Sequence, residues 1–397
     1  MWTDMKPAIE MPQLFEQGGD LISLAGGLPD LTRLPLRDIA DRLSRLVRLG
    51  GGTLLQYSTP HVARTLIPAI NDLAEREEVR VPAEQLVPTA GSQMGLMAVA
   101  LGLGSPGETI LCQTPLYPGA STAFRAGGLI VAAAPYDADG IDPDGLRASV
   151  TALRAGGATV RLLYANPTFQ NPSGATTDVA RRAALMEACG DLDLLLVEDN
   201  PYGLLAFDGS TTPACHSLDP GRVVYLGTFS KVFAPGLRCG WIAAPAHIAP
   251  VLRRTCEVMA LSPSVFAQSV LASFHAAHGW SDLITAYRDS YRHRAQLMSD
   301  ALERELGTGS PWQWDRPEGG FYLWLRHRDP EIDTVDTEAW AAPAAARGVS
   351  FVPGRHFSID GEHRHALRLC FSGVPVKRID EAISRLAGAL SEKRAAA

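Results

Sequence analysis

The stretch GTFSKVFAPGLRCGW, residues 227–241, decides how the rest of the chain is interpreted. It continues an apolar run, VVYLGTFS (residues 223–230), whose end carries the hydroxyl residues Thr228 and Ser230. Lys231 and then Arg238 follow. Parallel α/β sheets gather their ligands at the carboxyl ends of strands, and this set of side chains suits a ligand with both an aldehyde and a phosphate. A Ser-Lys pair alone is more often surface charge, so Lys231 must be judged together with the other segments.

Short apolar runs alternate with helical patterns on both sides of this stretch. The runs cover residues 109–115, 129–136, 160–167, 193–200, 223–230 and 239–245. Near-continuous apolar strands separated by helices predict a mostly parallel sheet with helices on both faces, which is an α/β fold. Helices are expected from Gly91 to Gly104 and from Asp178, a suitable N-cap, to Gly190.

The last third of the chain has a different pattern. From about Pro263 it predicts one extended helix that could connect two domains. Strand-like segments at residues 318–325 and 365–372 and a helix from Lys377 to about Ala389 then predict a smaller α+β domain. Because single cores seldom grow beyond about 250–300 residues, we expect two unequal domains, with an N-terminal arm that belongs partly to the smaller one. Residues 1–45 form an N-terminal arm and part of the small domain, residues 46–280 a large domain, and residues 281–397 the small C-terminal domain.

Composition narrows the functional classes. The chain is 46% hydrophobic and 20% charged, which fits a folded globular protein. A net charge of −7 without a dense basic tract argues against a nucleic-acid partner. Neither an apolar run of about 20 residues nor a signal-peptide pattern is present, so no membrane partner and a cytoplasmic location are expected. The six cysteines contain no C-x-x-C pair, which predicts buried, reduced thiols and no metal site.

Polar residues follow several of the expected strands. The segment YANPTFQNPSG (residues 164–174) presents Asn171 in a rigid turn, although such a turn more often only connects two elements than binds a ligand. In LLLVEDNPYG (residues 194–203), Asp199 ends an apolar strand and Tyr202 follows it. A carboxylate in that position is costly unless it meets a cation. A protonated pyridine nitrogen and a buried arginine both remain open as that cation.

Three further positions could bind a ligand. The segment VPTAGSQMGL (residues 87–96) offers the backbone amides of Gly91, Ser92 and Gln93 at a helix start, which suits a phosphate but also fits a plain capping turn. Tyr117 could stack on a flat ring or simply pack. Arg368, inside an apolar strand, needs an anion, either a substrate carboxylate or a structural acid.

Taken in order, these segments resemble fold-type I enzymes that depend on pyridoxal 5′-phosphate (PLP), in aminotransferase class I and II. The nearest branch is that of 2-aminoadipate and kynurenine aminotransferases and of the aminotransferase-like domains of MocR regulators. The motifs that carry the resemblance are SLAGGLPD (23–30), LLQYS (54–58), TAGSQMGL (89–96), TPLYPG (114–119), NPTFQNPSG (166–174), VEDNPYG (197–203), TFSKVFAPGLRCGW (228–241), PEGGFYLWL (317–325), VPGRHFSIDG (352–361) and LRLCFS (367–372). No winged-helix segment precedes them in this sequence, which favours a free-standing enzyme over a regulator.

The resemblance implies a seven-stranded, mostly parallel sheet, PLP as cofactor and a homodimer with shared active sites. It implies that Lys231 holds the cofactor as a Schiff base and that Asp199 pairs with the pyridine nitrogen. Tyr202 and Asn171 would then bond the cofactor's 3-oxygen, while Tyr117 covers the ring.

The resemblance also assigns the phosphate and the substrate. The phosphate would be held by Gly91, Ser92, Gln93, Thr228 and Arg238, and by Tyr57 from the partner subunit. Arg368 would bind the substrate α-carboxylate with Asn171 nearby, and Gly26 and Gly27 would border the pocket.

The implied reaction moves an α-amino group between an L-amino acid and a 2-oxo acid through Lys231. Three alternatives on the same scaffold, a lyase, a decarboxylase and an oxidative deaminase, remain open, as does a non-enzymatic PLP-binding module. One loop departs from the family pattern, since Ser58, His61 and Arg64 stand where relatives have a glycine-rich, acidic turn. His61 and Arg64 are expected at the surface, with contact to an unusual or acidic substrate as the alternative.

Overall fold

A seven-stranded sheet forms the centre of the computed structural model, which describes residues 20–57, 64–307, 309–328 and 335–392. Its strands run in the order β2-β10-β9-β8-β7-β3-β4. β10 is antiparallel to both neighbours, and the pairs from β9 to β4 are parallel. The bounds are β2 (Leu86–Thr89), β3 (Thr109–Cys112), β4 (Ile130–Ala133), β7 (Val160–Ala165), β8 (Leu195–Asp199), β9 (Val223–Thr228) and β10 (Gly240–Ala243). The prediction of a seven-stranded, mostly parallel sheet is confirmed.

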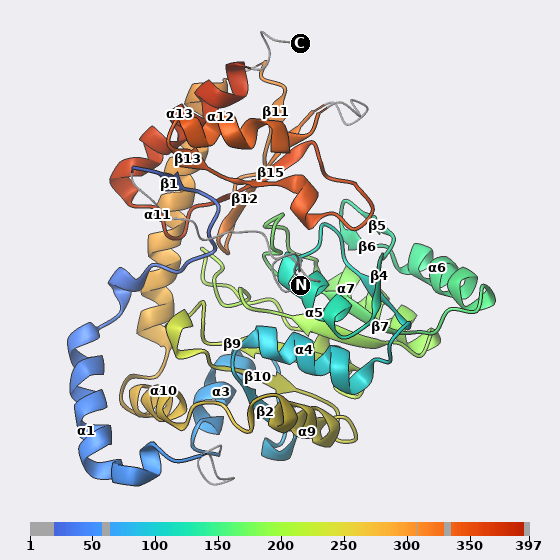
Figure 1. The fold of residues 1–397 in the computed structure, drawn as a ribbon, viewed down its shortest axis with the longest axis vertical. Helices are drawn as coiled ribbons and strands as arrows, with labels where there is room; N and C mark the ends of the chain where they lie inside the picture. Colours follow the sequence, from blue (N-terminus) through green and yellow to red (C-terminus); the bar gives the residue numbers. More distant parts are fainter. Residues whose placement is uncertain (1–19, 58–63, 308, 329–334, 393–397) are drawn as a thin grey trace, which may run out of the picture.

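Helices cover both faces of this sheet (Figure 1). α4 (Ser92–Leu103), α5 (Pro118–Ala126) and α9 (Ala249–Ala260) pack on one face, and α6 (Pro143–Ala155) and α7 (Val179–Asp191) on the other. Neighbouring strand residues point to opposite faces, so Ile110 and Cys112 join the core under α4 whereas Leu111 joins the core under α7. The predicted helices at 91–104 and 178–190 are α4 and α7, and the Asp178 side chain caps α7 as expected.

The single long helix expected from Pro263 is wrong. Two helices stand there, α10 (Val265–His278) and α11 (Ser281–Leu306). Gly279, with φ +62°, ends α10 in a left-handed conformation that glycine adopts at little cost, and the fully buried Trp280 anchors the turn. α11 alone runs from the level of the large sheet up through the C-terminal region (Figure 1).

The C-terminal region contains a four-stranded antiparallel sheet. Its order is β11 (Trp312–Gln313), β12 (Tyr322–His327), β15 (Ala366–Cys370), β14 (Val352–Pro353), flanked by α12 (Ala341–Ala346) and α13 (Ile379–Glu392). The N-terminal strand β1 (Ile22–Ser23) pairs with β13 (Val349–Ser350). α1 (Leu36–Leu54), which packs on α10, runs across the boundary expected at residue 45, and the division into domains stays a prediction.

The remaining described elements are short. Apart from seven 3₁₀ helices, they are α3 (Ile67–Ala74), α8 (Cys215–Leu218), β5 (Tyr136–Asp137) and β6 (Gly140–Ile141). All six cysteines are buried and unpaired. None of the helices in the described part of the chain combines the length and hydropathy that crossing a bilayer requires.

Candidate active site

One edge of the large sheet collects most of the predicted site residues. The carboxyl ends of β2, β3, β7, β8 and β9 all lie there, because these strands run in the same direction. Ser92, Tyr117, Asn171, Asp199 and Lys231 end these strands or follow them within a few residues. The chain therefore brings hydroxyl, amide, carboxylate and amine groups from distant parts of the sequence to one place.

Lys231 lies at the end of β9 with its amine turned toward the N-terminal segment. Its Nζ donates a hydrogen bond of 2.9 Å to the carbonyl oxygen of Gly27. Loss of hydration lowers the pKa of this amine to about 8, since an ammonium ion is disfavoured away from water. A neutral amine is the nucleophilic form, so the environment prepares Lys231 to attack a carbonyl carbon.

Asp199 presents one free carboxylate oxygen to the site. Its Oδ2 accepts a hydrogen bond of 3.0 Å from the Tyr164 hydroxyl, while its Oδ1 is buried and has no partner among the described residues. Burial raises the pKa of this carboxyl to about 6, against the opposing effects of Tyr164 and the charge of Lys231. The Asn166 side chain fixes the strand end by donating to the Asp199 carbonyl oxygen. A cationic N–H donor at Oδ1 would satisfy the group.

Two tyrosines meet beside Lys231. The hydroxyls of Tyr202 and Tyr322 lie 3.0 Å apart, and burial raises the pKa of both. The Lys231 amine is 5.8 Å from the centre of the Tyr202 ring. A Cβ atom at Gly27 would lie only 2.3 Å from the Tyr322 hydroxyl, so glycine is required for this close approach. Tyr202 is thus placed where the sequence predicted, with a second hydroxyl next to it.

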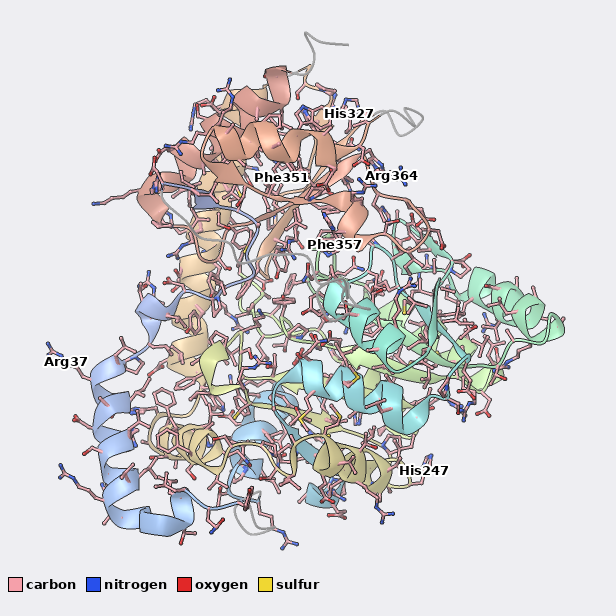
Figure 2. All side chains as sticks on the ribbon, in the orientation of Figure 1. Arg37, His247, His327, Phe351, Phe357 and Arg364 are labelled. Carbon is pink, nitrogen blue, oxygen red and sulfur yellow. The ribbon has the colours of Figure 1, made fainter. Side chains whose placement is uncertain are left out.

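Arg368 is buried and held in a fixed orientation. Its Nη1 donates 2.7 Å to Asn171 Oδ1, its Nη2 donates to the carbonyl oxygen of Ala25, and its Nε has no partner among the described residues. The guanidinium lies 4.4 Å from the ring centre of Tyr322 and 5.1 Å from that of Phe357. Figure 2 shows Phe357 on the side of the C-terminal region that faces the large sheet. No acidic side chain pairs with Arg368 in the described ranges, which leaves it suited to a carboxylate ligand.

A positively charged site, the cationic cradle, lies at the start of α4 and is formed by the Arg238 guanidinium and Gly91. The Arg238 guanidinium covers Gly91, where a Cβ atom would lie 2.4 Å from Nη2. Gly91 (φ +85°) and Arg238 (φ +51°) both take left-handed conformations, which non-glycine residues adopt rarely. In the described part of the chain, the Arg238 guanidinium donates to the backbone carbonyls of Pro235 and Ala90 and has no carboxylate partner. A guanidinium beside a helix N-terminus is a site for an anion such as phosphate.

The other predicted phosphate ligands differ in how they are placed. The Thr228 hydroxyl lies 3.0 Å from the Ser230 hydroxyl at the end of β9. The Gln93 side chain donates 2.8 Å to the Gly119 carbonyl, so it joins α4 to α5. Tyr117 precedes α5, and its ring lies over Gly119, where a Cβ atom would come within 2.5 Å of it.

Tyr57 and Arg64, the described residues at the two ends of the altered loop, are both exposed. Tyr57 lies just beyond α1, 72% exposed, and α1 stands apart from the C-terminal region in Figure 1. Arg64 is exposed as expected. Ser58 and His61 lie outside the described residues.

Sequence reasoning missed three residues of the site. Tyr164 and Asn166 fix Asp199, and Tyr322 contacts both Tyr202 and Arg368. Tyr164 and Asn166 lie two residues apart at the end of β7, beside β8, so strand alternation could have suggested them. Tyr322 carries no such signal, because its partners come from distant segments.

Comparison with known proteins gives one consistent result. The family model for aminotransferase class I and II matches residues 20–386. An aromatic-amino-acid aminotransferase of Thermococcus litoralis is 34% identical over 94% of this chain and 89% of its own. The kynurenine aminotransferase of Pyrococcus horikoshii, solved with PMP and kynurenine, has a TM-score of 0.85, with 31% identity over 94% of this chain and 92% of its own. The α-aminoadipate aminotransferase of Thermus thermophilus, solved with N-(5′-phosphopyridoxyl)-L-leucine, has a TM-score of 0.86, with 30% identity over 95% and 94%.

Proposed function

The chain belongs to aminotransferase class I and II, and we propose that Lys231, Asp199 and Arg368 carry its reaction. It is a PLP-dependent aminotransferase, which moves an amino group between an amino acid and a 2-oxo acid. The unpartnered Oδ1 of buried Asp199 is the observation that carries the assignment of the site, since a protonated pyridine nitrogen would satisfy it. When bound, PLP supplies an aldehyde that reacts with amines and a ring that accepts electrons.

Lys231 acts in this proposal as the covalent anchor and then as the base. Its amine would hold the cofactor through the aldehyde carbon, in place of the aldehyde oxygen, until a substrate amine takes its position. The released amine then removes the proton from the substrate Cα. The lowered pKa supports both roles, because each needs the neutral amine at near-neutral pH.

Asp199 keeps the ring nitrogen protonated in this proposal. Its second oxygen is held by Tyr164, so Oδ1 stays aimed at the cofactor side of the sheet. Tyr202 and Asn171 would donate to the cofactor's 3-oxygen, and Tyr117 would cover the ring. The phosphate would be held by Gly91, Ser92, Gln93, Thr228 and Arg238. The cationic cradle formed by Arg238 and Gly91 supports this role.

Arg368 recognises the substrate α-carboxylate in this proposal. Asn171 and the Ala25 carbonyl hold the guanidinium, and two aromatic rings flank it. Gly26 and Gly27 would border the same pocket. The named activities of the relatives make aromatic amino acids and 2-aminoadipate the first donors to test.

We further propose a homodimer in which Tyr57 reaches the partner's phosphate site. Large apolar side chains near the ends of α1 and α9 support this, with Leu55 75% and Val258 83% exposed in the single chain. A hollow of about 550 Å³, lined in part by Arg64 and Leu261, lies beside α9 and gives a second subunit a surface to fill. Light scattering should give the mass of two chains, and Tyr57→Phe should weaken PLP binding.

Two broader expectations remain part of the proposal. We retain residues 1–45, 46–280 and 281–397 as arm, large domain and small domain, and the pairing of β1 with β13 supports grouping the arm with the small domain. We also retain a cytoplasmic location, which suits six unpaired cysteines.

The test is a spectrum of the PLP-loaded protein mixed with one amino acid. An aminotransferase stalls after half a turnover without a 2-oxo acid, and the cofactor spectrum shifts to that of the amine form. Adding 2-oxoglutarate should restore the original spectrum. Continued release of ammonia without a 2-oxo acid would identify a lyase or deaminase instead, and no change with any amino acid would indicate a binding module.

A further inference from the structure

A second buried carboxylate lies behind the active site. Glu77 ends the 3₁₀ helix η2 (Glu75–Glu77) and is only 3% exposed. Its Oε2 accepts a hydrogen bond of 2.8 Å from the Tyr225 hydroxyl, and its Oε1 accepts one of 2.6 Å from the Asn200 side-chain amide. None of the roles proposed above uses this group.

Glu77 and Asp199 lie on opposite faces of the large sheet. Asp199 follows the alternation of Val197, which packs in the core under α4 and α5. Glu198 points to the other face, as does its register partner Tyr225, the residue that Glu77 contacts. Glu77 therefore does not reach the cofactor side of the sheet directly, and any effect on the reaction must pass through the end of β8.

Asn200 makes that link. It directly follows Asp199, and its backbone N–H donates 3.1 Å to the Leu226 carbonyl on β9. Its side-chain oxygen accepts 3.1 Å from the Gly203 N–H, which closes the turn from Asn200 to Gly203. Tyr202 stands inside this turn. The Asn200 amide thus joins Glu77 to the turn that carries Tyr202.

The turn also packs directly on Glu77. A Cβ atom at Gly203 would lie 1.7 Å from Glu77 Oε1 and 2.8 Å from the Asn200 side-chain nitrogen. Only glycine leaves room for this contact. Glu77 therefore constrains the position of the turn through two contacts. One is the hydrogen bond from Asn200, and the other is the close packing against Gly203.

The charge of Glu77 is unfavourable for stability. Burial and the charge of nearby Glu198 raise the pKa of Glu77 to about 8, although Tyr225 and Asn200 oppose this. Arg182, whose charge also opposes the rise, lies 3.9 Å from Glu198 and is bonded to backbone carbonyls. An apolar residue would often serve a core position equally well, so stability alone does not account for a carboxyl group at this position.

We propose, on the premise of the function proposed above, that Glu77 is a positioning residue that fixes Tyr202 through Asn200. Tyr202 then holds its hydroxyl at the cofactor's 3-oxygen. A donor at that oxygen favours the form of the lysine-bound cofactor that has lost its proton. Displacing Tyr202 should therefore raise the pH midpoint at which the visible absorbance of the bound cofactor titrates.

The test uses the full chain loaded with PLP. Glu77→Ala and Asn200→Ala should each raise that midpoint by about 0.5–1 pH unit, and the double variant should add little to either. Glu77→Gln keeps an acceptor oxygen for Asn200 and should restore the midpoint. Tyr225→Phe is the matched control, because it removes the other hydrogen bond to the same carboxylate and leaves Asn200 in place. Its midpoint should stay that of the unmodified protein.

The outcomes separate the two proposals. If the unmodified protein shows no lysine-dependent visible band, the proposed function itself is wrong. If the band is present and both alanine variants titrate like the unmodified protein, only the positioning role is overturned. Equal shifts in Asn200→Ala and Tyr225→Phe would also overturn it, since they would indicate general loosening. If Glu77→Ala does not fold, the comparison of Asn200→Ala with Tyr225→Phe decides the question alone.

Discussion

Tyr164 donates its hydroxyl proton to Oδ2 of Asp199 across neighbouring parallel strands, at 3.0 Å. Only Oδ1 is then left for another donor. Because Tyr164 is fully buried in the sheet, the carboxylate cannot rotate to present its other oxygen without losing this bond. The protein therefore fixes the orientation of the Asp199 carboxyl group before any ligand binds.

Replacing Asp199 by Asn should stabilise the cofactor-free protein at neutral pH. Burial raises the pKa of Asp199 from 3.8 to about 6, so the folded state holds a proton that the unfolded state has lost between these values. The contribution of Asp199 to the free energy of unfolding is fully present below about pH 4. As the pH rises through about 6, the free energy of unfolding falls by up to about 2–3 kcal/mol. Denaturation of both proteins at pH 4 and pH 7.5 should show a gain for Asp199→Asn only at the higher pH.

The same variant should lose most of its turnover while still binding PLP. Asparagine keeps the contact with Tyr164 but cannot hold a proton on the ring nitrogen. Cofactor affinity and the half-reaction rate are the two measurements. A variant with full activity would contradict the role of Asp199.

Replacing Lys231 by Ala should abolish the lysine-dependent visible band on addition of PLP, and with it the activity. Among the described residues, no second lysine lies in the site to form the covalent link, while the phosphate-binding residues would still bind the cofactor. Borohydride reduction followed by mass analysis should leave PLP attached to the unmodified protein only. Lys377→Ala, at an exposed lysine, is the matched control and should behave normally.

Arg368→Lys should raise the KM for amino acids by about 30-fold or more, because lysine keeps the charge but loses the planar donors, which contribute about 2 kcal/mol or more. PLP binding should be unchanged. Amines that lack the α-carboxylate provide the control, since their slow reaction should be the same in both proteins. A lowered rate with these amines as well would point to a damaged fold.

Tyr322 should affect the substrate through its ring more than through its hydroxyl. The ring lies over Arg368, and a cation–π contact of this kind contributes about 0.5–2 kcal/mol. Tyr322→Leu should therefore raise KM by about 3- to 30-fold, whereas Tyr322→Phe, which keeps the ring, should stay close to the unmodified value. The opposite order would assign the effect to the hydrogen bond with Tyr202.

Local pattern was enough to predict six of the seven strands of the large sheet and to single out polar residues that lie together at its edge. Buried parallel strands need continuous apolar runs, and each of the six predicted runs contains one strand of the large sheet. Lys231 and Asp199 were found because polar groups at the ends of such strands are rare and costly. The break at Gly279 was missed, since a single glycine inside a helical pattern is often tolerated.

Contacts between distant segments could not be predicted in this way. Tyr322 meets Tyr202 across 120 positions of sequence, and Asn200 meets Glu77 across 123. Neither pairing follows from a period or a motif, because it depends on how the C-terminal region and η2 pack on the large sheet. Residues that support the site from a distance therefore become visible only in three dimensions.

The bond from Arg368 to the Ala25 carbonyl joins positions 343 residues apart, and Lys231 reaches back 204 residues to Gly27. A ribosome must therefore synthesise almost the whole chain before the substrate pocket can close. Nascent chains that stop short of β15 contain Lys231 and Asp199 but lack Arg368, the proposed carboxylate ligand. A nascent chain should gain activity only when nearly all of it has been synthesised. The slow pairing of such distant segments should then limit the rate of the last folding step.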